Sequence, residues 1–252
     1  MMNFTLGLSI FLMTSFSANA SSPAPPLYES VLMIGDDHVA GSFGNALDAY
    51  LRTIAVEVNS IGECGSTPAN WIGVRTSFEK ANCGFWQRDI NNQEKESAEV
   101  KSRSIYEEIA KADPDLTVIV LGTYMLKSSR FLKDEESSVE KILLEVEKAR
   151  SKCIWIGPPQ IKKEPYASNY SEGVKLLKKW VTKNRCDFVD SSQFSKYKGK
   201  GGIEYQVAAG TRWASAVIRE IDKINRPSPR EQQQLNIDPF FPGTQPMDKY
   251  PR

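Results

Sequence analysis

The chain has 252 residues, of which 40% are hydrophobic, and this is enough for one domain with a sizeable core. Its 32 lysines and arginines are balanced by 31 aspartates and glutamates, which leaves a net charge of +1. This balance argues against a nucleic-acid or membrane-surface partner, because such proteins usually carry a basic patch or run. A small cluster of lysines is explained by a solvated loop; it comprises Lys196, Lys198 and Lys200.

Residues 1–20 have the features of a secretory signal peptide. Residues 6–16 are mostly apolar, and the tripeptide Ala-Asn-Ala at 18–20 fits the small-x-small cleavage rule. The apolar stretch is too short for a transmembrane anchor. We therefore expect a mature protein that begins at Ser21, is periplasmic or secreted, and is not inserted in the membrane.

The rest of the chain up to residue 225 alternates between two patterns. Buried strands are predicted from apolar runs at residues 30–35, 54–61, 116–122, 153–157 and 186–189. Helices are predicted at residues 39–53, 97–111, 135–152, 171–183 and 208–224. This alternation predicts an α/β domain over residues 27–225, with three α/β/α layers and a five-stranded parallel sheet.

Ligands of such sheets bind outside the carboxyl ends of the strands. The residues just after the first and third strands are therefore the first site candidates; they are Asp36, Asp37, Thr123 and Tyr124. The two aspartates also open a helix, where carboxylates cap backbone amides, so capping, ligand contact and catalysis all remain open for them.

Residues 62–92 form a long segment that we predict to be a loop, and long loops inside compact domains are usually functional. Its aromatic residues Trp71, Phe85 and Trp86 could stack on a sugar or pin the loop to the core, and we favour pinning. Arg88 and Asp89 are expected to pair within the loop.

The remaining features are the cysteines and the tail. An exported chain with four cysteines suggests two disulfides, while the lack of a CxxC pair argues against zinc.

Residues 226–252 are rich in proline and should form an irregular tail. An apolar island within it is a strap on the domain or a partner-binding motif, and we favour the strap; it comprises Leu235, Ile237, Phe240 and Phe241.

The segment VLMIGDDHVA at residues 31–40 resembles the first block of the SGNH (GDSL-type) hydrolases. That block is an apolar strand followed by Gly-Asp-Ser, in which the serine is the nucleophile. Further similarity follows in the expected order over residues 30–220, in GECGSTPANW, CGFWQRD, PDLTVIVLGTYM, CIWIGPPQ and GGIEYQVAAGTRWA. The resemblance implies a flavodoxin-like SGNH hydrolase fold and substrates that are esters, often acetyl groups on carbohydrate or cell-wall glycans.

The residues that react in this family are replaced here. The resemblance places the nucleophilic serine on Asp37, the asparagine of the oxyanion hole on Tyr124, and the Asp-x-x-His block on Gly201 and Glu204. The glycine that donates its amide to the oxyanion is retained as Gly65.

A serine–histidine mechanism also fails on chemical grounds. It needs an imidazole that faces the nucleophile. The chain has one histidine, His38, which directly follows Asp37. It therefore lies beside the nucleophile position, and the sequence predicts a pseudoenzyme rather than an active esterase.

The resemblance also implies how the cysteines pair. In this family the strands that begin at Cys153 and Cys186 are parallel neighbours, within bridging reach. The expected pairs are therefore Cys153–Cys186 and Cys64–Cys83.

Our main functional hypothesis is a secreted SGNH hydrolase-like protein that binds a glycan or another cell-wall ligand in the residual cleft. Its expected ligand-binding residues are Asp36, Asp37, Gly65, Tyr124 and Glu204. Glu204 should point toward Asp37, where two carboxylates could share a proton, bind a cation or act as an acid/base pair, unless Glu204 is simply a solvated loop residue.

Two alternatives remain open. One is a hydrolase for carbohydrate or ester substrates that uses Asp37 and Glu204. The other is a structural protein whose cleft is plugged by Tyr124, which could instead bond a ligand through its hydroxyl. No cofactor and no resident metal are expected.

Overall fold

The computed structural model describes residues 25–73, 84–98, 103–197 and 201–226. The predicted signal segment 1–20 and nearly all of the predicted tail lie outside these residues. So do Cys83, Lys198 and Lys200. All statements on structure below concern the described residues.

Five parallel strands form the centre of the sheet, in the order β2-β1-β5-β6-β7. Counted along the chain, this is the order 2-1-3-4-5 of flavodoxin-like folds. All five coincide with the predicted apolar runs to within a few residues. Their bounds are β1 (Tyr28–Gly35), β2 (Ala55–Glu63), β5 (Leu116–Val120), β6 (Lys152–Ile156) and β7 (Asp187–Val189).

The predicted strand count of five is wrong, because the sheet has seven strands. An antiparallel hairpin, β3 (Phe85–Arg88) and β4 (Glu94–Ser97), continues the sheet beyond β2. β3 lies in the segment expected to be a loop, and β4 lies between this segment and the next expected helix, which it overlaps only at Ser97. The turn is closed by Asp89, whose Oδ1 accepts the amides of Asn91 and Gln93 at 3.0 and 2.9 Å. Such side-chain turns are typical of aspartate, and no long apolar run marks the four-residue strands.

The long helices match the predicted segments, with shifted ends. The predicted helix 39–53 is two helices, because the chain is extended at Gly41. The helix predicted to start at residue 135 begins six residues earlier. The helices are α1 (Asp37–Ala40), α2 (Ser42–Ile54), α3 (Pro68–Trp71), α4 (Ile105–Ala112), α5 (Ser129–Lys148), α6 (Tyr166–Lys183) and α7 (Val207–Asn225), with short 3-10 turns η1 (Tyr124–Lys127) and η2 (Ser191–Gln193).

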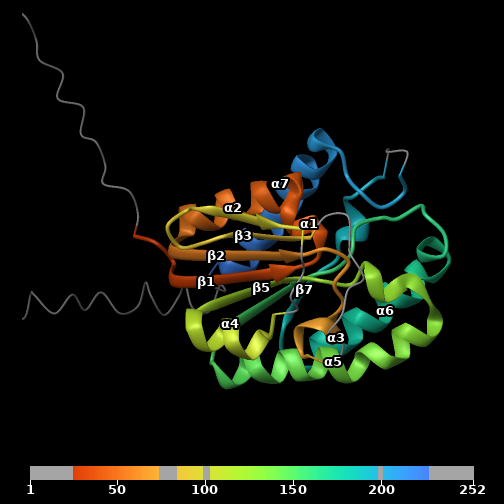
Figure 1. Ribbon diagram of the computed structural model, residues 1–252, viewed down its shortest axis with the longest axis horizontal. Coiled ribbons are helices and arrows are strands. Elements are labelled where there is room, and N and C mark those ends of the chain that lie inside the picture. The colour runs from red at the N-terminus through yellow and green to blue at the C-terminus, as the bar shows by residue number, and fades with distance from the viewer. Residues whose placement is uncertain (1–24, 74–83, 99–102, 198–200, 227–252) are drawn as a thin grey trace, which may run out of the picture.

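The helices cover both faces of the sheet, which confirms the three layers (Figure 1). α2 and α7 pack on one face through residues four apart, such as Leu47 and Leu51 of α2 and Val217 and Ile221 of α7. α4, α5 and α6 cover the other face. Because β1, β5 and β6 are buried over most of their length, they are largely apolar, and this is why the sequence predicts them well.

The two helices on the first face approach each other closely at Gly210. A Cβ atom there would lie 2.1 Å from the Ser42 hydroxyl oxygen and 3.0 Å from the backbone nitrogen of Phe43. Only glycine permits this distance between α7 and the start of α2. The contact places the start of α2 against the start of α7, next to the carboxyl end of β1.

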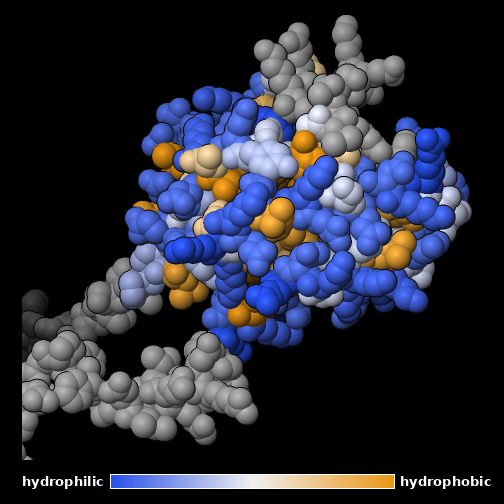
Figure 2. Space-filling view, turned by 90° about the horizontal axis from the view of Figure 1, so that it is seen from below, coloured by the Kyte–Doolittle hydropathy of each residue, from blue (hydrophilic) through white to orange (hydrophobic). Residues whose placement is uncertain are grey.

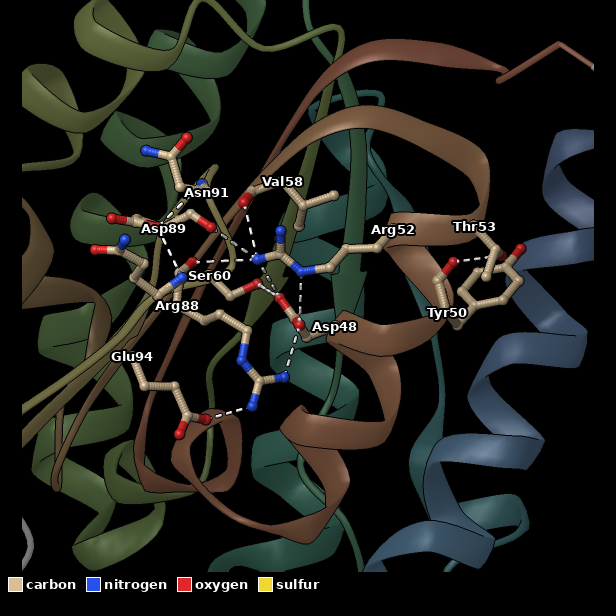
Figure 3. A network of polar contacts seen from close by, with 11 residues as sticks. Asp48, Tyr50, Arg52, Thr53, Val58, Ser60, Arg88, Asp89, Asn91 and Glu94 are labelled. Atoms are coloured by element: carbon tan, nitrogen blue, oxygen red, sulfur yellow. Dashed lines mark hydrogen bonds and ion pairs between the residues drawn. The ribbon is translucent and has the colours of Figure 1, made fainter.

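The hairpin is tied to α2 by a buried carboxylate, Asp48 (Figure 3). Arg52 donates two hydrogen bonds to it at 3.0 and 3.2 Å, Arg88 donates one at 3.0 Å, and the Ser60 hydroxyl donates one at 2.6 Å. The expected pair of Arg88 and Asp89 is therefore wrong: the Arg88 guanidinium turns to Asp48 and to Glu94. A buried carboxylate needs these donors more than the exposed Asp89 does.

The expected disulfide between Cys153 and Cys186 is present, with the Cα atoms 4.8 Å apart. Cys153 lies on β6, and Cys186 directly precedes β7, its parallel neighbour. Cys64 is also disulfide-bonded, while its expected partner Cys83 lies outside the described residues. The pair Cys64–Cys83 stays a prediction.

The outer surface of the helical layers is polar. The side of the molecule in Figure 2 is mostly hydrophilic, with separate apolar spots instead of a broad band. Among the described residues, no helix is long and apolar enough to cross a membrane. The apolar sides of the helices thus face the sheet.

Candidate functional site

The turn after β1 carries the first pair of candidate residues, Asp36 and Asp37. The Asp36 side chain caps α1, because its Oδ1 accepts the backbone amide of His38 at 3.0 Å. Asp36 is 1% exposed. Burial raises the pKa of its carboxyl well above the ordinary value, and the neighbouring Asp37 carboxylate raises it further. Asp36 is therefore a buried cap, as one of the alternatives for the two aspartates predicts.

Asp37 meets Tyr124 across the carboxyl ends of β1 and β5. The Tyr124 hydroxyl donates a hydrogen bond of 2.9 Å to Asp37 Oδ2. Burial and the Asp37 charge raise the pKa of Tyr124, so the phenol keeps its proton and remains the donor. The Asp37 carboxylate is thus held in place by the Tyr124 phenol.

His38 is buried among aromatic rings. Its ring centroid lies 5.3 Å from that of Trp213 and 6.3 Å from that of Tyr205, both edge-on. Burial lowers the pKa of His38, although the Asp37 and Glu204 carboxylates act in the opposite direction. The imidazole is therefore neutral at pH 7, and its Nε2 has no hydrogen-bond partner in the described part of the chain.

A cavity of about 390 Å³ opens beside this turn. Asp37 and Glu204 both line it, while the expected orientation of Glu204 toward Asp37 stays a prediction. The wall also contains His38 and a third carboxylate, Glu96 of β4. The Ser42 hydroxyl is a further polar group of the wall, and four aromatic side chains line it as well, namely Phe43, Phe85, Trp86 and Tyr205.

The other predicted ligand-binding residues lie apart from this cavity. Tyr124 and Gly65 are not among its lining residues, and Tyr124 contacts it only through Asp37. Gly201 is exposed, and a Cβ atom there would have only the Tyr197 hydroxyl within 4 Å, at 3.7 Å. The cavity beside Asp37 is therefore open, and the Tyr124 ring does not fill it.

The aromatic residues of the long loop are buried, which confirms the pinning alternative. Trp71 is 0%, Trp86 3% and Phe85 8% exposed. Phe85 and Trp86 nevertheless contribute to the cavity wall. Glu96 and Tyr205 were not among the predicted site residues. The register of the hairpin, in which Trp86 faces Glu96, brings the first of these into the site, and Tyr205 directly follows Glu204.

Another buried carboxyl belongs to Glu63, the last residue of β2, which pairs with Phe85 of β3. It is 0% exposed and accepts the backbone amide of Arg103 at 2.8 Å. Burial raises its pKa from 4.5 to about 7, against the opposing effect of Arg103. No sequence signal distinguishes this residue from a solvated glutamate.

This raised pKa makes the stability depend on pH. Between its unfolded pKa of 4.5 and about 7, the native state holds more protons on Glu63 than the unfolded state does, so the free energy of unfolding falls as the pH rises. We expect the Glu63→Gln variant, which keeps the acceptor for Arg103, to gain stability relative to the wild type as the pH rises through this window. Urea unfolding at both ends of the window measures this, and parallel curves for the two proteins would contradict it.

The Nε2 of the single histidine has no hydrogen-bond partner in the described residues, and its ring packs against Trp213. The Asp37 carboxylate accepts a hydrogen bond from the Tyr124 phenol. No group of three or more His, Cys, Asp or Glu side chains in the described ranges could hold a metal ion. What this site offers is hydrogen bonding through carboxylates, next to aromatic surfaces.

The fold is that of the SGNH-like esterases, as known structures show. A carbohydrate acetylesterase from Sinorhizobium meliloti matches with a TM-score of 0.53 at 16% identity, over 78% of this chain and 99% of its own. The native aryl esterase from M. smegmatis matches with a TM-score of 0.54 at 14% identity, over 77% and 99% of the two chains. A variant of an acetyl xylan esterase from Geobacillus stearothermophilus gives a TM-score of 0.52 at 16% identity, over 78% and 96%.

Sequence comparison adds nothing to this similarity. No protein-family model matches the chain, and no curated protein sequence matches it. At these low identities the structural neighbours define the fold alone, and the activity has to be argued from the site.

Proposed function

We propose that the protein binds a glycan in the cavity beside Asp37 and does not act as a serine esterase. The observation that carries this proposal is the cavity itself, which is open at about 390 Å³ and combines carboxylates with aromatic side chains. Carboxylates accept hydrogen bonds from sugar hydroxyls, and aromatic rings cover the apolar faces of sugars. Among the structural neighbours, two are esterases of carbohydrates, which supports a glycan as the ligand.

The lost chemistry supports the second half of the proposal. A serine esterase needs a hydroxyl nucleophile, an imidazole base and an oxyanion hole. Asp37 and Tyr124 occupy two of these positions and bond each other. The buried His38 contacts Trp213 instead of a nucleophile.

One observation favours a second candidate function. Asp37 and Glu204 line one cavity, and two carboxylates can hydrolyse a glycosidic bond as acid and base. In that case the protein would be a glycan hydrolase.

The open cavity argues against the structural alternative, in which the Tyr124 ring plugs the cleft.

The test compares binding and turnover in one experiment. Acetylated and plain xylo-oligosaccharides are titrated into the wild type and the Asp37→Ala and Glu204→Ala variants, while NMR follows acetate and reducing ends. We expect each variant to weaken binding about tenfold, since a hydrogen bond to a charged group contributes about 1.5–3 kcal/mol. Neither product should accumulate.

The control variant is Asp134→Ala, which removes a surface carboxylate remote from the cavity on α5. It should bind like the wild type. Release of acetate would establish an esterase, and new reducing ends that depend on Asp37 and Glu204 would establish the glycan hydrolase. If all variants, with circular dichroism like the wild type, bind equally, the cavity is not the binding site.

We further propose that the protein works in an oxidising compartment outside the cytoplasm. The buried Cys153–Cys186 bond supports this location, because structural disulfides persist in such compartments and are rare in the cytosol. The apolar segment 1–20 supports export of the chain.

A further inference from the structure

The charge of the cavity is one-sided. Its described lining contains three carboxylates, Asp37, Glu96 and Glu204, and neither a lysine nor an arginine. The one basic side chain in the described lining is His38, which is 5% exposed. Burial keeps it uncharged at pH 7, so it does not balance the carboxylates.

Two guanidinium groups that lie over rings of the cavity wall do not balance the carboxylates either. Arg88 lies over the Trp86 ring, 5.5 Å from its centroid, and Arg103 lies over the Phe85 ring at 4.1 Å. Neither arginine lines the cavity. Each is bonded to carboxylates elsewhere, Arg88 to Asp48 and Glu94, and Arg103 to Glu108. Their charge is therefore already compensated.

A second feature of the wall points to a ligand. His38 lines the cavity, yet its Nε2 is buried without a hydrogen-bond partner in the described residues. An unpaired buried polar atom is costly, and a donor from a bound molecule would remove this cost. A protonated amine is such a donor, and it has three hydrogens to share among the imidazole nitrogen and the carboxylates.

We infer that the glycan of this cavity carries a protonated amine, so that the ligand is an amino sugar whose nitrogen is not acetylated. This inference rests on the proposed glycan-binding function and narrows it. Uronic acids and phosphorylated sugars are disfavoured by the same carboxylates. The aromatic side chains of the wall contact the sugar ring, and the carboxylates favour a ligand with a positive charge.

The experiment uses three tetrasaccharides with the same β-1,4-linked backbone. Glucosamine tetramer carries amines, N-acetylglucosamine tetramer carries amides, and cellotetraose carries hydroxyls. Each is titrated calorimetrically into the full chain and into the Glu96→Gln/Glu204→Gln variant. We expect the glucosamine tetramer to bind the wild type at least about tenfold more tightly than cellotetraose, and the difference to shrink at high salt.

The double variant separates charge from hydrogen bonding. Glutamine still bonds hydroxyls but without the charge, so the affinity for cellotetraose should fall by about tenfold, while the preference for the amine over cellotetraose should fall to about twofold or less. The matched control is Glu29→Gln/Glu107→Gln, which removes two exposed charges that do not line the cavity and should keep the preference.

Each outcome decides between the two proposals. Equal binding of the three tetramers, or tightest binding of the amide, overturns the inferred amine and leaves glycan binding intact. An amine preference that survives in the Glu96→Gln/Glu204→Gln variant also overturns the inference, because other residues then recognise the positive charge of the amine. If no tetramer and no xylo-oligosaccharide binds, the proposed function itself fails.

Discussion

Replacing Asp48 by alanine should destabilise the protein by about 3 kcal/mol or more, because it leaves two guanidinium groups without their buried partner. Asp48 is 0% exposed and accepts hydrogen bonds from Arg52, Arg88 and Ser60. Urea unfolding followed by tryptophan fluorescence measures the loss. The effect should reach the site, because Arg88 belongs to the hairpin that carries Trp86 and Glu96.

The matched control is again Asp134→Ala. The contact between Asp134 and Arg130 is 3.9 Å long and exposed, so its loss should cost less than about 1 kcal/mol. If Asp48→Ala does not fold, the Ser60→Ala variant tests the same network, with an expected loss of about 1 kcal/mol for one buried hydrogen bond. Losses for Asp48→Ala as small as for Asp134→Ala would show that the network does not stabilise the fold.

The central sheet was predictable because β1, β5 and β6 are buried over most of their length. Runs such as residues 31–34 and 118–120 are apolar without interruption, so their type and order follow from the hydrophobic effect. The hairpin escaped prediction for the opposite reason. β4 is exposed along its whole length and has the polar composition of a loop. Its pairing with β3 is fixed by the turn at Asp89.

The candidate site was predictable only along the strand ends. The expected meeting of Asp37 and Tyr124 follows from the parallel order of β1 and β5. The wall of the cavity does not follow from sequence, because it joins α1, the hairpin and the segment before α7. Glu96 enters through a hairpin that was not predicted. The contact of Tyr124 with Asp37, instead of with the cavity, depends on side-chain direction, which spacing alone does not give.

Removing the Cys153–Cys186 bond should also have a large effect. The bond closes a loop of 33 residues that contains α6, and in the chain-entropy model such a link stabilises by about 4 kcal/mol. We expect the Cys153→Ala/Cys186→Ala variant to lose stability of this order in urea unfolding under oxidising conditions. A loss of this size is a large fraction of the stability of a typical domain.

A reductant separates the effect of the bond from the effect of packing. Both cysteines are largely buried, so their replacement also removes sulfur atoms from the core, and that cost persists when the bond is absent. Dithiothreitol also reduces the bond of Cys64, but it does so in both proteins, so the stability of the reduced wild type should fall to within about 1 kcal/mol of the similarly treated double variant. If the difference between the two proteins stays as large in reductant as without it, packing rather than the cross-link stabilises this part of the sheet.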